Sequence, residues 1–212
     1  APSDGVITGY GVIDGNLVYV YSQDASVLNG TVGEMHAKKI SALYDLAMKT
    51  GAPVIGLVDC AGMRLQEATD ALEAFGGIYL KQTMASGMIP QITAVFGTCG
   101  GGMAVVPALT DFTFIESKKG KMFVNSPNAL DGNYTEKCDT ASAEFQSKET
   151  GLIDAVESEE EILAEIRQLI GLLPSNFEDN DSFEECTDDL NRACEDIAAC
   201  AGDTSLALSR IA

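Results

Sequence analysis

Hydrophobic and polar residues alternate near the start of the chain in the way that β-strands require. We expect two strands within residues 6–21, because two apolar runs flank Asp14-Gly15, a dipeptide that favours tight hairpin turns. Continuous apolar runs over residues 54–58, 91–96 and 112–115 predict further strands that are buried on both faces.

Helical spacing of apolar residues predicts helices between and after these strands. Apolar positions from Met35 to Ala47 recur near a period of 3.6, and Gly51-Ala52-Pro53 ends that helix. Four other helices are expected, over residues 66–85, from Gly102 to about Leu109, over 159–172 and over 188–200.

Strand, glycine-rich loop and helix recur along the chain, and this order predicts an α/β fold with parallel pairing and right-handed crossovers. Ligands of such folds bind near the carboxyl ends of the strands, where two polar glycine turns occur here. We expect residues 6–156 to form the α/β core and residues 159–212 to form helical additions. The domain boundary is predicted at 176, with residues 177–212 as an acidic helical extension or linker.

Charge and composition narrow the classes of partner and chemistry. The 212 residues carry a net charge of −19, which argues against nucleic acid or an anionic membrane surface as partner. Residues 157–195 are strongly acidic, so they form either a solvated face or a docking surface for a basic partner. No apolar run approaches the roughly 20 residues that a membrane span needs. The phosphate-loop, dinucleotide and serine-hydrolase motifs are absent from the sequence.

Cysteine and histidine usage predicts no metal site and a reducing, cytoplasmic location. His36 is the single histidine, and no two cysteines have the C-x-x-C spacing of zinc ligands. Scattered cysteines are typical of a reducing compartment, and no signal peptide is evident. The chain starts abruptly close to a strand, as a fragment of a longer protein would. The six cysteines are Cys60, Cys99, Cys138, Cys186, Cys194 and Cys200.

Gly100, Gly101 and Gly102 form the strongest local signal for chemistry. Three glycines after a buried strand let a backbone approach a ligand without interference from Cβ atoms. If a helix begins there, its first amides are unpaired and can bind a carbonyl oxygen that gains negative charge, as in an oxyanion hole. The alternative is a tight turn that serves only close packing of helix and strand.

The segment from Asp59 to Arg64 is the second candidate, since small residues again follow a buried strand. Arg64 has two possible roles: it binds an anion such as a CoA phosphate, or it pairs with Asp59 or Glu67 to hold the loop. A nucleophilic role for Cys60 is not favoured because such a thiol needs an accompanying base. His36 lies on an early helix, and we expect it to be a packed or capping residue.

Several segments together resemble the acyl-CoA carboxylase carboxyltransferase family of the crotonase superfamily. Residues 59–66, D-C-A-G-M-R-L-Q, are similar to the family's D-S-G-G-A-R-I-Q, with Cys60 and Ala61 in place of its Ser-Gly. The other matching segments occur in the family's order, at residues 33–40, 51–56, 85–92, 97–102, 107–112, 151–154 and 172–176.

This resemblance implies a crotonase-like fold of repeated β-β-α units and a specific chemistry. The family's chemistry places the amides of Gly101 and Gly102 in an oxyanion hole, where a thioester carbonyl becomes an enolate while its α-carbon exchanges a carboxyl group with biotin. The ureido nitrogen of biotin acts on the proton, so no side-chain base is required. The residues implied in binding the CoA thioester are Ala61, Gly62, Met63, Arg64 and Gly100.

The resemblance also implies partners. The family has two homologous halves, and only the first, CoA-binding half is similar to this chain. The expected partners are an acyl-CoA, a biotin carboxyl carrier protein and a C-terminal half that supplies the biotin side, in an oligomer whose sites lie between subunits.

Other functions remain open at this point. A biotin-dependent decarboxylase subunit would run the same transfer backwards and pass carboxybiotin to a membrane pump, without a membrane span of its own. An enoyl-CoA hydratase or isomerase would need acidic residues, for which Glu34 and Glu67 are the weak candidates. An inactive CoA-binding or assembly subunit would bind thioesters and transfer nothing.

Overall fold

The structure is a computed structural model that describes residues 3–127, 139–179, 189, 191–194 and 196–211. The chain divides into two compact units, Ala1–Ser182 and Phe183–Ala212. The division expected at residue 176 stays a proposal. Cys138 and Cys186 lie outside the described residues.

A seven-stranded sheet forms the centre of the first unit, in the order β1-β2-β3-β4-β5-β7, with β6 paired to β4 beyond the end of β5. The hairpin of β1 and β2 is antiparallel and all other pairs are parallel, which confirms the expected α/β class. The strands are β1 (Val6–Ile13), β2 (Asn16–Gln23), β3 (Val54–Cys60), β4 (Gln91–Gly100), β5 (Phe112–Glu116), β6 (Lys121–Phe123) and β7 (Ala155–Glu157).

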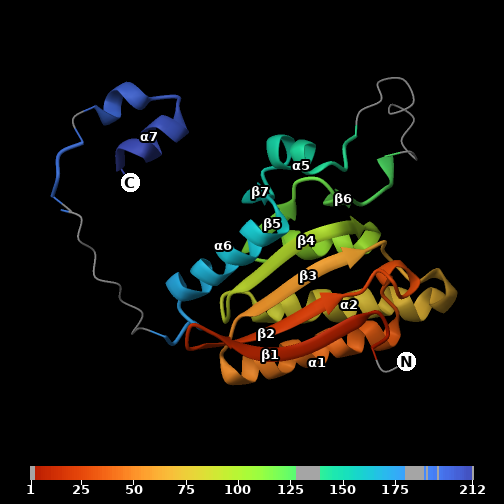
Figure 1. Ribbon diagram of the computed structural model, residues 1–212. Helices are drawn as coiled ribbons and strands as arrows, with labels where there is room; N and C mark the ends of the chain where they lie inside the picture. The colour runs from red at the N-terminus through yellow and green to blue at the C-terminus, as the bar shows by residue number, and fades with distance from the viewer. Residues whose placement is uncertain (1–2, 128–138, 180–188, 190, 195, 212) are drawn as a thin grey trace. The chain divides into compact units, whose positions relative to one another are not determined.

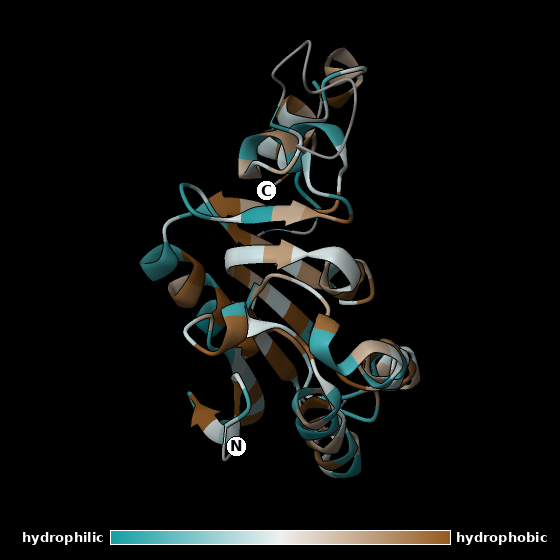
Figure 2. Ribbon diagram, turned by 90° about the vertical axis from the view of Figure 1, so that its right-hand side faces the viewer, coloured by the Kyte–Doolittle hydropathy of each residue, from teal (hydrophilic) through white to brown (hydrophobic). Residues whose placement is uncertain are grey.

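Helices cover both faces of this sheet (Figure 1). Helices α1 (Glu34–Thr50) and α2 (Ala68–Ala85) lie on one face, and α6 (Glu159–Leu172) lies on the other. Figure 2 shows the mostly hydrophobic strands between these layers. Helix α1 ends where Gly51 adopts a left-handed conformation (φ +65°), as its glycine predicts.

The helix predicted over residues 159–172 is observed as α6, and it packs on the sheet of the main unit. Its buried residues recur at helical spacing and pack on the apolar side chains of β2 to β5. They are Ile162, Ile166 and Ile170. A capping box between Ser158 and Glu161 fixes its start. Without α6 this face of the sheet would expose its central strands to water.

Short elements connect the long ones. They are the 3₁₀ turns η1 (Leu28–Gly30), η2 (Leu65–Glu67) and η3 (Gly101–Ala104), and the helices α3 (Val105–Ala108) and α5 (Ala143–Glu149). The helix expected from Gly102 is therefore a 3₁₀ turn followed by one α-helical turn. Gly101 has a left-handed φ of +59°, and glycine is costly in a helix, so the helix cannot begin at the strand end.

The second unit contains η5 (Ile197–Cys200) and α7 (Thr204–Ile211). Of the helix predicted over 188–200, the described residues show only the 3₁₀ turn η5. Helix α7 is a separate element, and Asp203 caps its start by accepting a hydrogen bond from the Leu206 N–H at 2.9 Å. Among the described residues, no helix is both long and apolar enough to cross a bilayer.

Candidate active site

The two glycine turns predicted from the sequence meet at the carboxyl edge of β3 and β4. The first turn is residues 59–64 and the second is residues 100–102. Cys60 and Cys99 are neighbours in the parallel ladder, so the segments that follow them lie side by side. A Cβ atom built on Gly62 would be 3.1 Å from the carbonyl oxygen of Gly100, and one built on Gly100 would be 2.9 Å from that of Ala61. Only glycine fits this approach, and the turns therefore form one backbone-lined surface.

Backbone hydrogen bonds hold the first turn in place. Ala61 N–H donates to Asn29 O at 3.0 Å, and Arg64 N–H donates to Val32 O at 2.9 Å. Val32 N–H donates in return to Gly62 O at 2.9 Å. The loop that precedes α1 thus fixes the turn that follows β3, in the manner of a short parallel ladder.

Arg64 anchors this turn from inside the protein. Its side chain is only 5% exposed, and Nη1 contacts Asp4 Oδ1 at 2.8 Å and Glu67 Oε1 at 2.9 Å. Nη2 donates to Thr31 O at 2.9 Å. Of the two pairings left open by the sequence, Glu67 is the one observed, because Asp59 accepts from the Thr98 N–H instead. Contact of Arg64 with a CoA phosphate stays a proposal that this geometry does not favour.

Side chains of helix α2 contact the second glycine turn. The Tyr79 hydroxyl donates to Gly102 O at 2.5 Å, and a Cβ on Gly102 would lie 3.3 Å from the ring of Phe75. Phe123 of β6 closes the other side, 3.1 Å from a Cβ built on Gly100. Sequence reasoning missed Tyr79 and Phe123 as neighbours of the site. The one available sequence signal was that Phe75 and Tyr79 are four residues apart, which places both side chains on one face of a helix.

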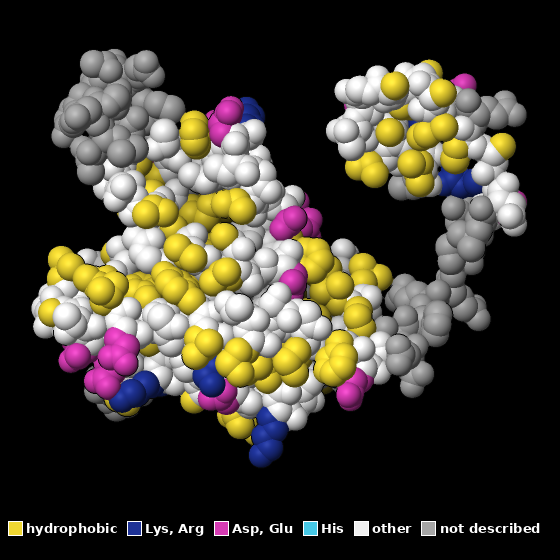
Figure 3. All heavy atoms as spheres, turned by 180° about the vertical axis from the view of Figure 1, so that it is seen from behind, with side chains coloured by type: hydrophobic (Ala, Val, Ile, Leu, Met, Phe, Trp, Pro, Cys, Tyr) yellow, Lys and Arg dark blue, Asp and Glu magenta, His cyan; other side chains and the backbone are white. Residues whose placement is uncertain are grey.

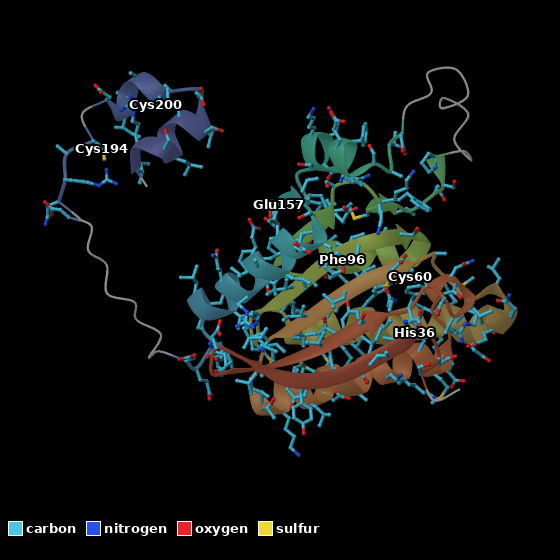
Figure 4. All side chains as sticks on the ribbon, in the orientation of Figure 1. His36, Cys60, Phe96, Glu157, Cys194 and Cys200 are labelled. Atoms are coloured by element: carbon cyan, nitrogen blue, oxygen red, sulfur yellow. The ribbon has the colours of Figure 1, made fainter. Side chains whose placement is uncertain are left out.

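Cys60 is a structural residue of the first turn (Figure 4). Its Sγ accepts from the Gly62 N–H at 3.3 Å and lies 3.5 Å from Gly62 O. Burial raises the pKa of the thiol to about 11, so it stays neutral at physiological pH and is a poor nucleophile. This agrees with the expectation from sequence.

His36 is packed on the buried face of α1, as expected, and does not serve as a base. The side chain is fully buried, with Nδ1 3.0 Å from Asp4 O and Nε2 3.1 Å from Gln23 Nε2. Burial lowers its pKa to about 4, so the ring is neutral. Nδ1 therefore carries the proton and donates to Asp4, while Nε2 accepts from Gln23.

Glu67 and Glu34, the weak candidates for hydratase chemistry, are also occupied. Glu67 Oε2 accepts from the Glu34 N–H at 2.6 Å, which lowers the pKa of Glu67 and caps the start of α1. Glu34 pairs with Lys38 at 2.5 Å. Across the described part of the chain, no group of His, Cys, Asp and Glu has the arrangement of a metal site.

We predict that Cys60→Ser leaves the activity of this site, measured in the full-length protein, within about twofold of normal, because a hydroxyl can make the same two contacts with Gly62. Steady-state kinetics of the variant check this. Loss of activity would instead make Cys60 a participant in the reaction.

Comparison with known proteins identifies the family. Residues 1–206 match the carboxyl transferase domain. The chain belongs to the carboxyl transferase domain family. It is 41% identical over 208 residues to methylmalonyl-CoA decarboxylase subunit alpha of Veillonella parvula, covering 96% of the chain and 41% of that protein. It is 40% identical over 201 residues to the propionyl-CoA carboxylase beta chain of Roseobacter denitrificans, covering 88% and 39%.

Solved carboxyl transferases share the fold. Transcarboxylase 12S, solved with methylmalonyl-coenzyme A and methylmalonic acid bound, matches 91% of the chain and 38% of its own, with a TM-score of 0.83 and 32% identity. The beta subunit of Pseudomonas aeruginosa geranyl-CoA carboxylase matches 81% and 33%, with a TM-score of 0.72 and 28% identity. The crotonase-like fold expected from sequence is confirmed. The chain thus spans about two fifths of the length of these relatives.

Proposed function

We propose that this carboxyl transferase domain is the CoA-binding half of a biotin-dependent carboxyltransferase, which moves a carboxyl group between biotin and an acyl-CoA thioester. The observation that carries the proposal is the contact of the two glycine turns at the ends of β3 and β4. Backbone groups without intervening Cβ atoms suit close approach of a thioester.

Gly101 and Gly102 would stabilise the enolate. Their amides are proposed to donate to the thioester oxygen as it gains negative charge. Ala61, Gly62, Met63 and Gly100 would line the thioester, and Arg64 would hold their turn in shape through Asp4 and Glu67. The dipole of helix α3 contributes little to stabilisation of the enolate, because α3 has only four residues.

The proton of the α-carbon needs a base that these turns do not offer. The Cys60 thiol is neutral, His36 is buried with both nitrogens engaged, and Glu67 is bound to Arg64. Biotin, when bound, supplies the carboxyl group and a ureido nitrogen that acts on this proton. The chain's own task is then to bind the thioester, orient it and exclude water. The occupied Glu67 also disfavours a hydratase or isomerase.

We further propose a biotin carrier protein and a C-terminal half as partners, in an oligomer. Exposed apolar side chains support this. Leu72, Leu80 and Met84 of α2 are at least half exposed, and Figure 3 shows hydrophobic side chains gathered on the rear face of the main unit. Transcarboxylase 12S is described as a hexamer. The free cysteines of the described residues, Cys60, Cys99, Cys194 and Cys200, suit a cytoplasmic location.

The test uses the full-length protein, methylmalonyl-CoA with a radiolabelled carboxyl group, and its biotin carrier as acceptor. We expect label on the carrier and loss of transfer when avidin sequesters the biotin. Either direction of net transfer, carboxylation or decarboxylation, agrees with the proposal. Binding of the thioester without transfer would indicate an assembly subunit instead.

A further inference from the structure

A hydrogen bond from Tyr79 connects helix α2 to the second glycine turn, residues 100–102. The Tyr79 hydroxyl, on the fourth turn of α2, donates to the carbonyl of Gly102 at 2.5 Å, at the short end of the range for a bond between a hydroxyl and a carbonyl oxygen. The two residues are 23 positions apart in the sequence. The bond therefore belongs to the tertiary packing of the site and not to local turn geometry.

The second glycine turn needs such a contact because its own backbone is conformationally unrestricted. Gly100, Gly101 and Gly102 lack the Cβ atoms that restrict φ and ψ in other residues, and Gly101 already lies at φ +59°. Donors stabilise a developing charge only if their direction is set before the reaction. In a run of three glycines, neighbouring groups must set it.

The following residue is held from the opposite side. Cys99 Sγ lies 3.4 Å from Met103 O, and Gln23 Nε2 lies 3.7 Å from the Met103 sulfur. Those contacts fix the chain after the turn. Tyr79 supplies a side-chain contact to the carbonyl of Gly102, which also accepts from the Val105 N–H.

The Tyr79 ring is itself held in place. It packs on Phe75 at a centroid distance of 5.9 Å, and both residues lie on the same face of α2. Partial burial raises the pKa of its hydroxyl, so the group stays protonated and keeps its role as a donor at physiological pH.

We infer that Tyr79 is a positioning residue for carboxyl transfer: its hydroxyl holds the Gly102 carbonyl, which restricts rotation of the Gly102 backbone and so keeps the amide N–H groups of the glycine turn directed at the substrate carbonyl. This inference rests on the proposed function of the turn. Tyr79 acts through Gly102 and does not touch the substrate. Its loss should slow the chemical step and leave affinity for the CoA thioester intact.

The experiment compares Tyr79→Phe with Tyr44→Phe in the full-length protein, with methylmalonyl-CoA as substrate and the biotin carrier as acceptor. Both changes remove one hydroxyl that bonds a residue on or beside α2, since Tyr44 Oη accepts from Gln82 at 3.4 Å in the core. We expect Tyr79→Phe to lower kcat about five- to tenfold, the effect of one hydrogen bond, with KM changed less than twofold. Tyr44→Phe should leave kcat unchanged.

A second readout separates positioning from general loosening of the fold. The infrared stretch of the thioester carbonyl of bound propionyl-CoA should shift less from its value in water in Tyr79→Phe than in the unmodified protein. Equal shifts and equal kcat values would overturn the inference and leave the function intact. Equal losses of kcat in both variants would also overturn it, because the effect would then be a general one. Absence of transfer by the unmodified protein would overturn the proposed function, and the inference with it.

Discussion

Replacement of Gly102 by valine is expected to lower carboxyl transfer by about 100- to 1000-fold, the range found when one oxyanion donor is lost. Gly102 does not have a left-handed φ, so valine meets no backbone strain there. Its Cβ, however, would lie 3.0 Å from Tyr79 Oη and 3.3 Å from the Phe75 ring. Because Tyr79 and Phe75 pack on each other, we expect the turn to move away from α2 to make room, and the amides of Gly101 and Gly102 to turn with it.

A matched change shows whether the loss is local. Gly9→Val adds the same atoms to an exposed strand, where a Cβ has no neighbour within 4 Å, and it should leave transfer unchanged. Thermal melting should show that both variants fold. Near-normal transfer by a folded Gly102→Val variant would mean that these amides do not carry the reaction.

Replacement of Arg64 by methionine is expected to reduce the free energy of unfolding by about 3 kcal/mol, as typical of a buried ion pair that loses one partner. The guanidinium is buried among Asp4, Glu67 and the carbonyl of Thr31, and methionine leaves all three without their donor. Urea denaturation followed by circular dichroism measures the change. The variant should also bind CoA thioesters weakly, since the first glycine turn loses its anchor.

Arg167→Met is the control for charge alone. Arg167 pairs with Asp14 at 2.5 Å, but both side chains are more than half exposed, so this pair should contribute less than about 1 kcal/mol. If the two variants were equally stable, Arg64 would not be the structural anchor inferred here. Normal stability with loss of thioester binding would return Arg64 to the role of a phosphate ligand.

Long periodic segments account for the parts of the fold that sequence predicts well. The hairpin of β1 and β2, helices α1 and α6, and strands β3 and β4 each have enough residues to show a period of 2 or 3.6 or a continuous buried run. Strands β6 and β7 have three residues each, too few to show any period, and they were missed. Their place depends on pairing with β4 and β5, which is a tertiary property.

The candidate site also has features that the sequence predicts and features that depend on tertiary contacts. Parallel strands predict that the glycine turns after β3 and β4 lie at one edge, and the structure places Gly62 against Gly100. The sequence could not choose between Asp59 and Glu67 as the partner of Arg64, because that choice depends on Asp59 binding the Thr98 amide across the ladder. Tyr79 was missed because an aromatic residue on an amphipathic helix normally belongs to the core.

The most direct test of the account is a structure of the full-length protein with a bound, non-reactive CoA thioester. We expect the thioester oxygen to lie within about 3.2 Å of the backbone nitrogens of Gly101 and Gly102, the reach of an N–H···O hydrogen bond. The acyl chain should then pass over Ala61 and Gly62. A thioester whose oxygen faces away from both amides, or binds at another edge of the sheet, would contradict the account.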